Sequence, residues 1–193
     1  LIKHGKIPVH IPQPRRRYGQ HLHQNAETFA GLRNMDRYFT VLYQTARIIT
    51  TCASVEELAE KILPEIIDSL PVSGAAMYMY SIFDEEYDLI AGVSADVPQS
   101  VSREASFLKK LGEEESVSAV DNTGAGDLCF FAPVEDDNGL IGFIGLASEN
   151  EPAAEDRILI ETVCKMISPV IVNLRTKQEE LMKDRLKNKK WQL

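Results

Sequence analysis

The spacing between apolar residues changes twice along this chain, from helical to strand-like and back to helical. This order limits the possible folds more than any other feature of the sequence. Apolar residues recur at helical spacing over residues 35–70 and alternate as in strands over much of residues 74–148. Helical spacing returns after residue 153. The predicted order is therefore two helices, a region of strands and one long closing helix.

Two helices are predicted before the first strand. The first, residues 35–51, has one apolar seam at alternating spacings of four and three: Met35, Phe39, Leu42, Ala46 and Ile49. The second begins with Ser54 as N-cap and has Glu57 three residues later, as in a capping box. Its buried face is expected at Leu58, Ile62, Ile66 and Leu70. Pro64 is expected to kink or break this helix.

The region of strands divides into two hairpins with a looser segment between them. Residues 75–94 form the first hairpin across an acidic turn. Residues 128–148 form the second across the turn Asp-Asp-Asn-Gly, which is typical of antiparallel pairs. A short helix over residues 104–110 and a short strand over residues 116–120 are predicted between the hairpins.

Composition indicates one packed domain between two basic arms. The chain has 193 residues, of which 44% are hydrophobic, and a formal net charge of −8. Residues 1–34 form a basic, proline-containing linker, and residues 175–193 are also basic, so the domain over residues 35–174 is strongly acidic. Such a domain is expected not to bind nucleic acid, because affinity for phosphate comes from clustered Lys and Arg.

The first residue is Leu1 rather than Met, which indicates a fragment or a processed product. The sequence contains no apolar run near the ~20 residues of a membrane span and no signal-peptide pattern. A cytoplasmic location is therefore expected.

Cysteine and histidine do not predict a metal site. The cysteines are odd in number, widely spaced and in apolar contexts, which favours reduced core thiols: Cys52, Cys129 and Cys164. The histidines all lie in the basic linker, without a carboxylate or thiol at useful spacing: His4, His10, His21 and His23.

The segment DNTGAGD, residues 121–127, resembles the GAGD motif of ribokinase-like sugar kinases. In those enzymes the glycines open a helix whose N–H groups hold phosphate charge. Here the next residues, Leu-Cys-Phe-Phe-Ala-Pro-Val, predict a strand, and no other nucleotide-binding motif is present. A kinase is therefore not predicted.

Three blocks of sequence together resemble a GAF domain, the small-molecule sensor module of bacterial signalling proteins. They are SVEELAEKILPEIIDSL leading into GAAMYMYSIFDEEYDLIAGVS, then FFAPVEDDNGLIGFIGLAS, then EPAAEDRILIETVCKMISPVIVNL. The resemblance covers about residues 36–174. It implies an α+β fold of GAF/PAS type, with a central antiparallel sheet of about five or six strands and the N- and C-terminal helices packed on one face. It also implies a pocket on the other face, closed by residues 95–127.

The resemblance places the DNTGAGD loop at the rim of this pocket. Polar side chains and glycine N–H groups there could hold a ligand, with a plain surface turn as the alternative: Asp121, Asn122, Thr123, Gly124, Gly126 and Asp127. Strand alternation puts Met77, Met79 and Ser81 on one face and Tyr78, Tyr80 and Ile82 on the other, without assigning the faces. The candidate ligand-binding residues are Met77, Met79, Ser81, Phe107, Asp121, Thr123, Asp127, Cys129 and Phe131. Core packing is the alternative for the methionines and aromatic residues.

GAF domains bind cyclic nucleotides, haem, bilins and other small molecules. Features of this sequence argue against three of these ligands. No histidine follows residue 23, which argues against haem ligation. None of the cysteines falls where a covalent bilin is attached in the family, and the cyclic-nucleotide pattern NKFDE is absent. The cofactor stays unknown, and a role without any ligand is open.

The closing helix carries an apolar seam in heptad register. Its members are Ile160, Cys164, Ile167, Ile171, Leu174 and Leu181, with Gln178 as a polar position. In GAF proteins such a helix pairs with its twin and continues into an effector such as a histidine kinase. We therefore expect a homodimeric, non-enzymatic sensor of a two-component system, with residues 175–193 as its exit helix. Pro169 is expected to bend this helix.

Three alternatives remain open from the sequence. The chain could be a monomer with a simple amphipathic last helix. It could be a ligand-free dimerisation or protein-interaction module. It could also be a thiol reductase of GAF fold, which would need its cysteines clustered at the pocket.

Overall fold

The computed structural model describes residues 35–113, 116–118 and 125–190, without the side chains of residues 185–190. Residues from 38 onward form one compact unit, and the architecture below is that of this unit. The expected linker of residues 1–34 lies outside the described residues. So do four residues of the candidate loop: Asp121, Asn122, Thr123 and Gly124.

A six-stranded antiparallel sheet forms the centre of the described structure, in the order β3-β2-β1-β6-β5-β4. The strands are β1 Gly74–Ser81, β2 Glu86–Val93, β3 Ser100–Ser102, β4 Val117–Ser118, β5 Phe130–Asp136 and β6 Gly139–Ala147. Both expected hairpins are present, β1 with β2 and β5 with β6. The predicted α+β class is confirmed.

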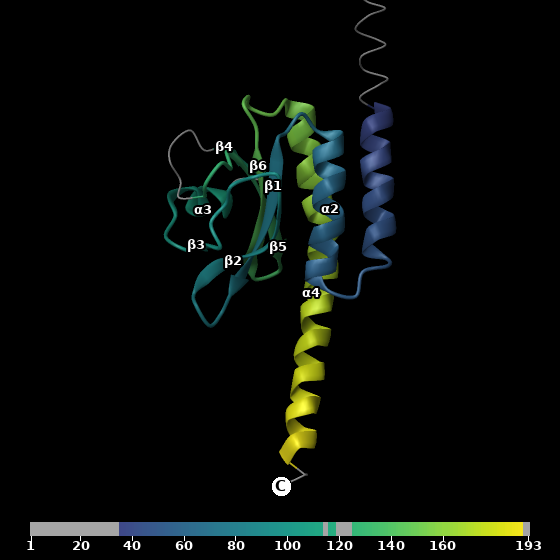
Figure 1. Cartoon of the computed structure of the whole chain (residues 1–193), viewed down its shortest axis with the longest axis vertical. Coiled ribbons are helices and arrows are strands. Elements are labelled where there is room, and N and C mark those ends of the chain that lie inside the picture. The colour runs from purple at the N-terminus through teal and green to yellow at the C-terminus, as the bar shows by residue number, and fades with distance from the viewer. Residues whose placement is uncertain (1–34, 114–115, 119–124, 191–193) are drawn as a thin grey trace, which may run out of the picture. The chain divides into compact units, whose positions relative to one another are not determined.

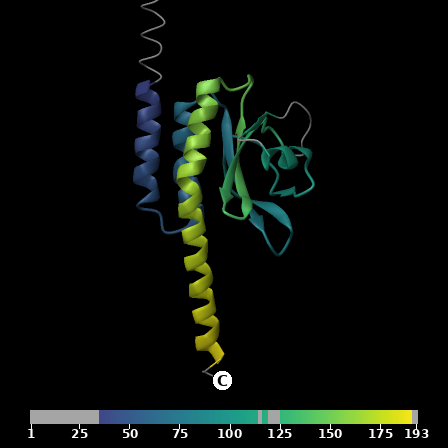
Figure 2. The ribbon, with the colours of Figure 1, turned by 180° about the vertical axis from the view of Figure 1, so that it is seen from behind.

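Helices cover both faces of this sheet. The helices are α2 Val55–Ser69, α3 Ser106–Leu111 and α4 Ala154–Lys190, and residues 38–49 are also helical. The two opposite views in Figures 1 and 2 show α2 and α4 against one face and α3 on the other. No helix among the described residues is both long and apolar enough to cross a bilayer.

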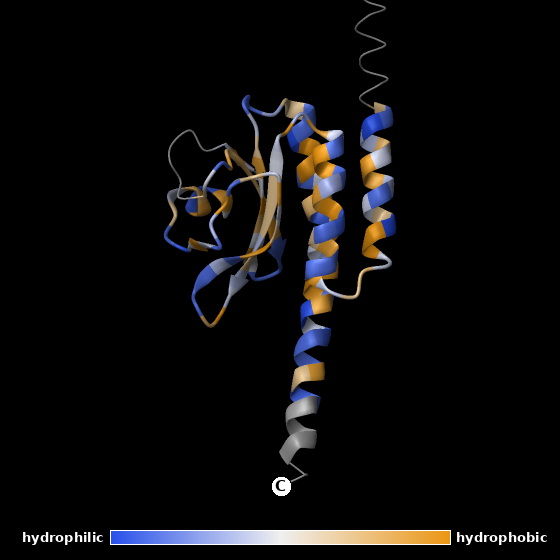
Figure 3. Ribbon diagram, in the orientation of Figure 1, coloured by the Kyte–Doolittle hydropathy of each residue, from blue (hydrophilic) through white to orange (hydrophobic). Residues whose placement is uncertain are grey.

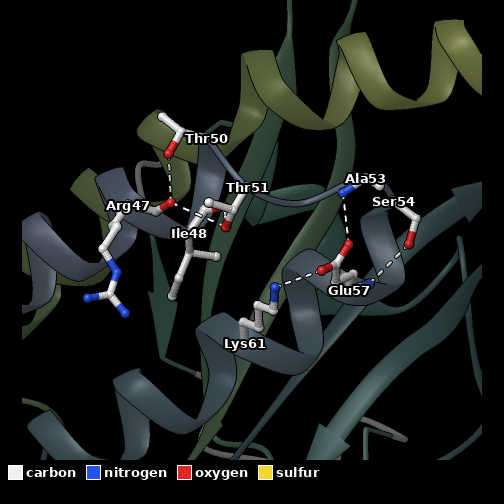
Figure 4. Close-up of polar contacts among 8 residues, drawn as sticks. All are labelled: Arg47, Ile48, Thr50, Thr51, Ala53, Ser54, Glu57 and Lys61. Atoms are coloured by element: carbon white, nitrogen blue, oxygen red, sulfur yellow. Dashed lines mark hydrogen bonds and ion pairs between the residues drawn. The ribbon is translucent and has the colours of Figure 1, made fainter.

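The start of α2 shows the expected capping box (Figure 4). Ser54 Oγ accepts a hydrogen bond from Glu57 N at 3.1 Å, and Glu57 Oε2 accepts one from Ala53 N at 2.8 Å. Lys61 Nζ lies 2.6 Å from Glu57 Oε1, so the same carboxylate also forms an i,i+4 ion pair. These bonds satisfy N–H groups that a helix start leaves without partners, and they fix where α2 begins.

The core on the helix-covered face is formed by α2, α4 and alternate residues of β1, β5 and β6. Met77 and Met79 of β1 point into it, as do Ile144 of β6 and Ala132 of β5. Gly142 lies opposite Met79, and a Cβ on it would come within 2.4 Å of Tyr78 O. The close approach of β1 and β6 at this point therefore requires glycine.

The helix of residues 38–49 buries a different face from the predicted seam. Val41, Thr45 and Ile48 are buried, whereas Phe39 is 66% exposed and Ala46 is exposed. Because Thr45 is polar, a search for regularly spaced apolar residues does not find the buried face formed by Val41, Thr45 and Ile48. The predicted seam is therefore wrong at Phe39 and Ala46.

Neither proline ends its helix. α2 continues from Pro64 to Ser69, and α4 continues from Pro169 to Lys190. Each proline removes one backbone hydrogen bond, but buried apolar neighbours such as Leu63 and Ile66 hold α2 to the core on both sides of Pro64. Of the expected kink or break at Pro64, the break is therefore wrong.

Candidate functional site

Aromatic rings fill the space between the sheet and α3. Phe107 of α3 stacks on Phe131 of β5 with ring centroids 4.0 Å apart, and it meets Phe143 of β6 edge-on at 5.5 Å. Tyr78 of β1 stacks on Phe143 at 4.9 Å. Phe107 is 2% exposed and the other three rings are 0% exposed. This face is therefore a packed aromatic cluster at its centre.

Two tyrosines extend the cluster toward polar groups. The Tyr78 hydroxyl donates to Pro98 O at 2.7 Å, and burial raises the pKa of Tyr78 to about 12. Burial also raises the pKa of Tyr87, whose ring lies 5.5 Å from that of Phe143. Arg103 lies over the ring of Tyr80 at 5.7 Å, a cation–π distance. Both buried hydroxyls are neutral at physiological pH and are suited to hydrogen bonding, not to acid–base chemistry.

Gly126 and Asp127 form a link between two loops. Asp127 N donates to Asp96 O at 3.0 Å, and Asp127 Oδ2 accepts from Asp96 N at 3.1 Å. Gly126 has φ +66°, and a Cβ on it would come within 2.2 Å of Asp96 O. The described end of the GAGD segment therefore ties residues 125–129 to the loop after β2 and leads into strand β5.

The structure divides the predicted ligand-binding residues between different places. Phe107 and Phe131 are in contact in the aromatic cluster. Met77 and Met79 lie on the opposite, helix-covered face, so they are not brought together with the two rings. Ser81 lies at the end of β1, where its Oγ donates to Asp84 Oδ2 at 3.1 Å.

Cys129 lies just before β5 and is half-buried. Its thiol is 3.5 Å from Leu146 O and 3.4 Å from Ser148 O. Cys164 is buried in the helix-side core, which raises its pKa, and Cys52 follows the helix of residues 38–49. All three thiols are free. Among the described residues, no group of three or more His, Cys, Asp and Glu side chains is placed to hold a metal ion.

The predicted seam of α4 serves mainly the core of the chain itself. Four of its members are at most 1% exposed and pack against the sheet and α2: Ile160, Cys164, Ile167 and Ile171. These four are therefore unavailable to a second copy. Leu174 is half-buried and Leu181 is 61% exposed.

Sequence reasoning missed part of the aromatic cluster. Tyr78, Tyr87 and Phe143 were not among the candidates, although strand alternation already separates Tyr78 from Met77 and Met79. Small residues give no signal for the choice of face, because Ala75 and Gly142 lie with the methionines and Ala76 and Gly145 lie with Tyr78.

No protein-family model matches the sequence, and no curated protein matches it at a significant level. Solved structures do match it. The GAF domain of a phosphoenolpyruvate-protein phosphotransferase from Coxiella burnetii gives a TM-score of 0.63 at 16% identity, over 74% of this chain and 97% of that chain. The GAF domain of a protein described as a sensor histidine kinase from Pseudomonas syringae pv. tomato gives 0.60 at 11%, over 81% and 99%. The free methionine-R-sulfoxide reductase from Neisseria meningitidis, in complex with its substrate, gives 0.63 at 12%, over 72% and 91%.

Proposed function

From its GAF fold we infer that this chain is a regulatory sensor domain that passes a signal from its sheet to α4. The observation that supports this most directly is the continuity of α4. One helix of 37 residues begins in the core and ends far beyond it. In Figure 3 this helix has many apolar residues beside the sheet and is mostly hydrophilic beyond it.

Core packing and two hydrogen bonds couple the sheet to α4. Ile160, Ile167 and Ile171 are buried in the helix-side core. Glu135 N of β5 donates to Ser168 Oγ at 3.3 Å, and Arg175 Nη2 donates to Tyr80 O of β1 at 3.1 Å. A shift of β1 or β5 would therefore move the helix as it leaves the body.

We propose that the part of α4 beyond the body receives the signal, and that it pairs with its twin in a homodimeric stalk. Leu174 and Leu181 are seven residues apart, on one stripe of α4, and Leu181 is exposed. In this proposal the stalk carries an effector, such as a histidine kinase, and the domain itself catalyses no reaction. Because Ile160 to Ile171 serve the chain's own core, the seam itself can contact a second copy only from Leu174 onward.

The input is either a small molecule or a partner protein. The closed packing of Phe107, Phe131, Phe143 and Tyr78 favours the partner, because these rings already occupy the centre of the face where the family resemblance implies a pocket. A ligand-free interaction module is therefore the second candidate function. A reductase receives less support, since Cys164 is buried in the helix-side core, whereas Cys129 lies before β5.

Native mass spectrometry of the purified chain tests both parts of this proposal. We expect a dimer for the wild type and a monomer for Leu181→Glu. Ile158→Glu is the matched control, because Ile158 lies on the same helix and is 63% exposed, against 61% for Leu181. This control should remain dimeric.

Each outcome decides between the candidates. Extra mass that is released on denaturation would support a small-molecule sensor, and bare polypeptide mass would support the interaction module. A wild-type monomer at every concentration would reject the stalk. Equal loss of the dimer in both variants would place the contact elsewhere on α4.

A further inference from the structure

An apolar groove lies where α4 leaves the body, on the helix-covered side of the sheet. Its volume is about 560 Å³. Its apolar wall is formed by the hairpin of β1 and β2, the start of α2 and the outgoing part of α4: Val55, Met79, Ile82, Phe83, Ile90 and Met182. Figure 1 shows the hairpin and the outgoing part of α4 extending on the same side of the body.

The rim of this groove exposes large hydrophobic side chains. Phe83 is 98% exposed, Ile82 is 72% exposed and Met182 is 62% exposed. The hairpin tip is correspondingly orange in Figure 3. Contiguous apolar surface of this kind on a folded domain marks a place where another molecule binds.

The shape of the groove favours a helix over a small molecule. A small ligand in a pocket has most of its surface buried, but here the rim side chains themselves stand in solvent. Along α4 the groove runs from Arg175 to Lys183, about 12 Å at the rise of an α-helix. That length fits about two turns of a docked helix, with apolar anchors at spacings of three and four.

The charged side chains around the groove indicate which kind of helix would bind there. Glu56, Asp88 and Glu179 line the groove, and Asp84 and Glu85 follow Phe83 at the exposed hairpin tip. Among the side chains that the structure describes, the cations that line it are Arg175 and Lys183. The guanidinium of Arg175 also donates to Tyr80 O, which holds it against β1. Among these described side chains, carboxylates outnumber cations by five to two and complement basic side chains of a partner.

We propose that this groove is a docking site for a basic amphipathic helix of a partner protein. The apolar face of that helix fills the groove between Phe83 and Met182, and its Lys or Arg side chains meet the carboxylates of the rim. The inference does not require a dimeric stalk. Arg175, Glu179 and Met182 form one stripe of α4, and Gln178, which also lines the groove, lies on the neighbouring stripe with Leu174 and Leu181. A bound helix would contact β1, β2 and α4 together, at the point where the signal is proposed to leave.

The test is fluorescence anisotropy of the full chain with a labelled synthetic peptide. The probe has 14 residues, leucine and lysine only, with the leucines on one helical face. One control peptide has the same composition in an order without an apolar face, and another has glutamate in place of lysine. We expect saturable binding of the first peptide alone, weakened by added salt.

Variants of exposed residues locate the binding without threatening the fold. Phe83→Ser and Met182→Ser should each weaken binding of the probe about tenfold or more, as buried interface anchors do. Ile158→Ser removes an apolar side chain that is as exposed as Met182 from the distant start of α4, and it should change affinity by less than about twofold.

Several results would overturn the proposal. They are no binding of the basic peptide, equal binding of the glutamate peptide, or equal loss in Phe83→Ser and Ile158→Ser. Self-association that Phe83→Ser abolishes would assign the groove to a second copy instead. Binding to phosphatidylglycerol vesicles that depends on Phe83 would assign it to a membrane surface. A monomeric wild type that still binds the probe at this groove would separate this inference from the stalk proposal.

Discussion

Replacing Phe107 with leucine should destabilise the domain by removing the ring that holds α3 to the sheet. Leucine at this position stays buried and apolar, so most of the transfer free energy is retained. The ring contacts with Phe131 at 4.0 Å and Phe143 at 5.5 Å are lost. Each such pair contributes roughly 0.5–1.5 kcal/mol beyond burial, so Phe107→Leu should cost about 2 kcal/mol.

Urea denaturation followed by near-ultraviolet circular dichroism measures this cost as a change in the unfolding free energy. Phe39→Leu is the matched control, since Phe39 is 66% exposed, and it should change stability by less than about 0.5 kcal/mol. An unchanged slope of free energy against urea would show that only stability differs. If Phe107→Leu and Phe39→Leu cost the same, the aromatic cluster does not hold α3, and the argument that this face is closed to ligands fails with it.

Two further predictions concern the same face. Burial raises the pKa of Tyr78 to about 12, whereas a tyrosine in the unfolded state loses its proton near pH 10. The neutral Tyr78 hydroxyl therefore contributes fully to stability below about pH 10. This contribution is lost as the pH rises toward 12. Tyrosinate absorbance should show Tyr78 and Tyr87 titrating later than a free tyrosine, and Tyr78→Phe should remove the part that titrates near pH 12. A titration unchanged by that variant would contradict the assignment. Gly126→Ala should cost about 1–3 kcal/mol, because φ is +66° and a Cβ would overlap Asp96 O. Gly112→Ala, at φ −78° with its nearest contacts at 3.8 Å, should be nearly neutral in the same urea assay, and equal costs would contradict the link between the two loops.

The sequence was sufficient for the order of the helices and for both hairpins, because the hydrophobic period and the turn residues are local signals. It was also sufficient for the start of α2, where Ser54 and Glu57 form the expected bonds. It missed β3, a three-residue strand at the sheet edge. So short a strand has almost no period of its own and depends on its partner β2.

The two faces of the sheet could not be distinguished from the sequence. Alternation in β1 separates Met77 from Tyr78, but methionine and tyrosine are equally suited to a buried face. The choice depends on tertiary contacts: the close packing of α2 and α4 on one side, and the acceptor that Pro98 O offers to the Tyr78 hydroxyl on the other. Ile82 and Phe83 were passed over for a related reason, since a strand pattern that runs into a turn gives no sign that its last apolar residues stay exposed.

The apolar seam of α4 was ambiguous for a different reason. A seam with heptad spacing is the same in sequence whether it packs into the chain's own sheet or against a twin helix. The structure shows that Ile160 to Ile171 take the first role. The seam becomes polar at Gln178, three residues after Arg175, which donates a hydrogen bond to Tyr80 O of β1. The loss of apolar character therefore marks the point where the helix leaves the body. Because the end of β1, the groove beside Phe83 and the exposed Leu181 all lie around this point, a partner bound there would act on the helix where it is least held by the core.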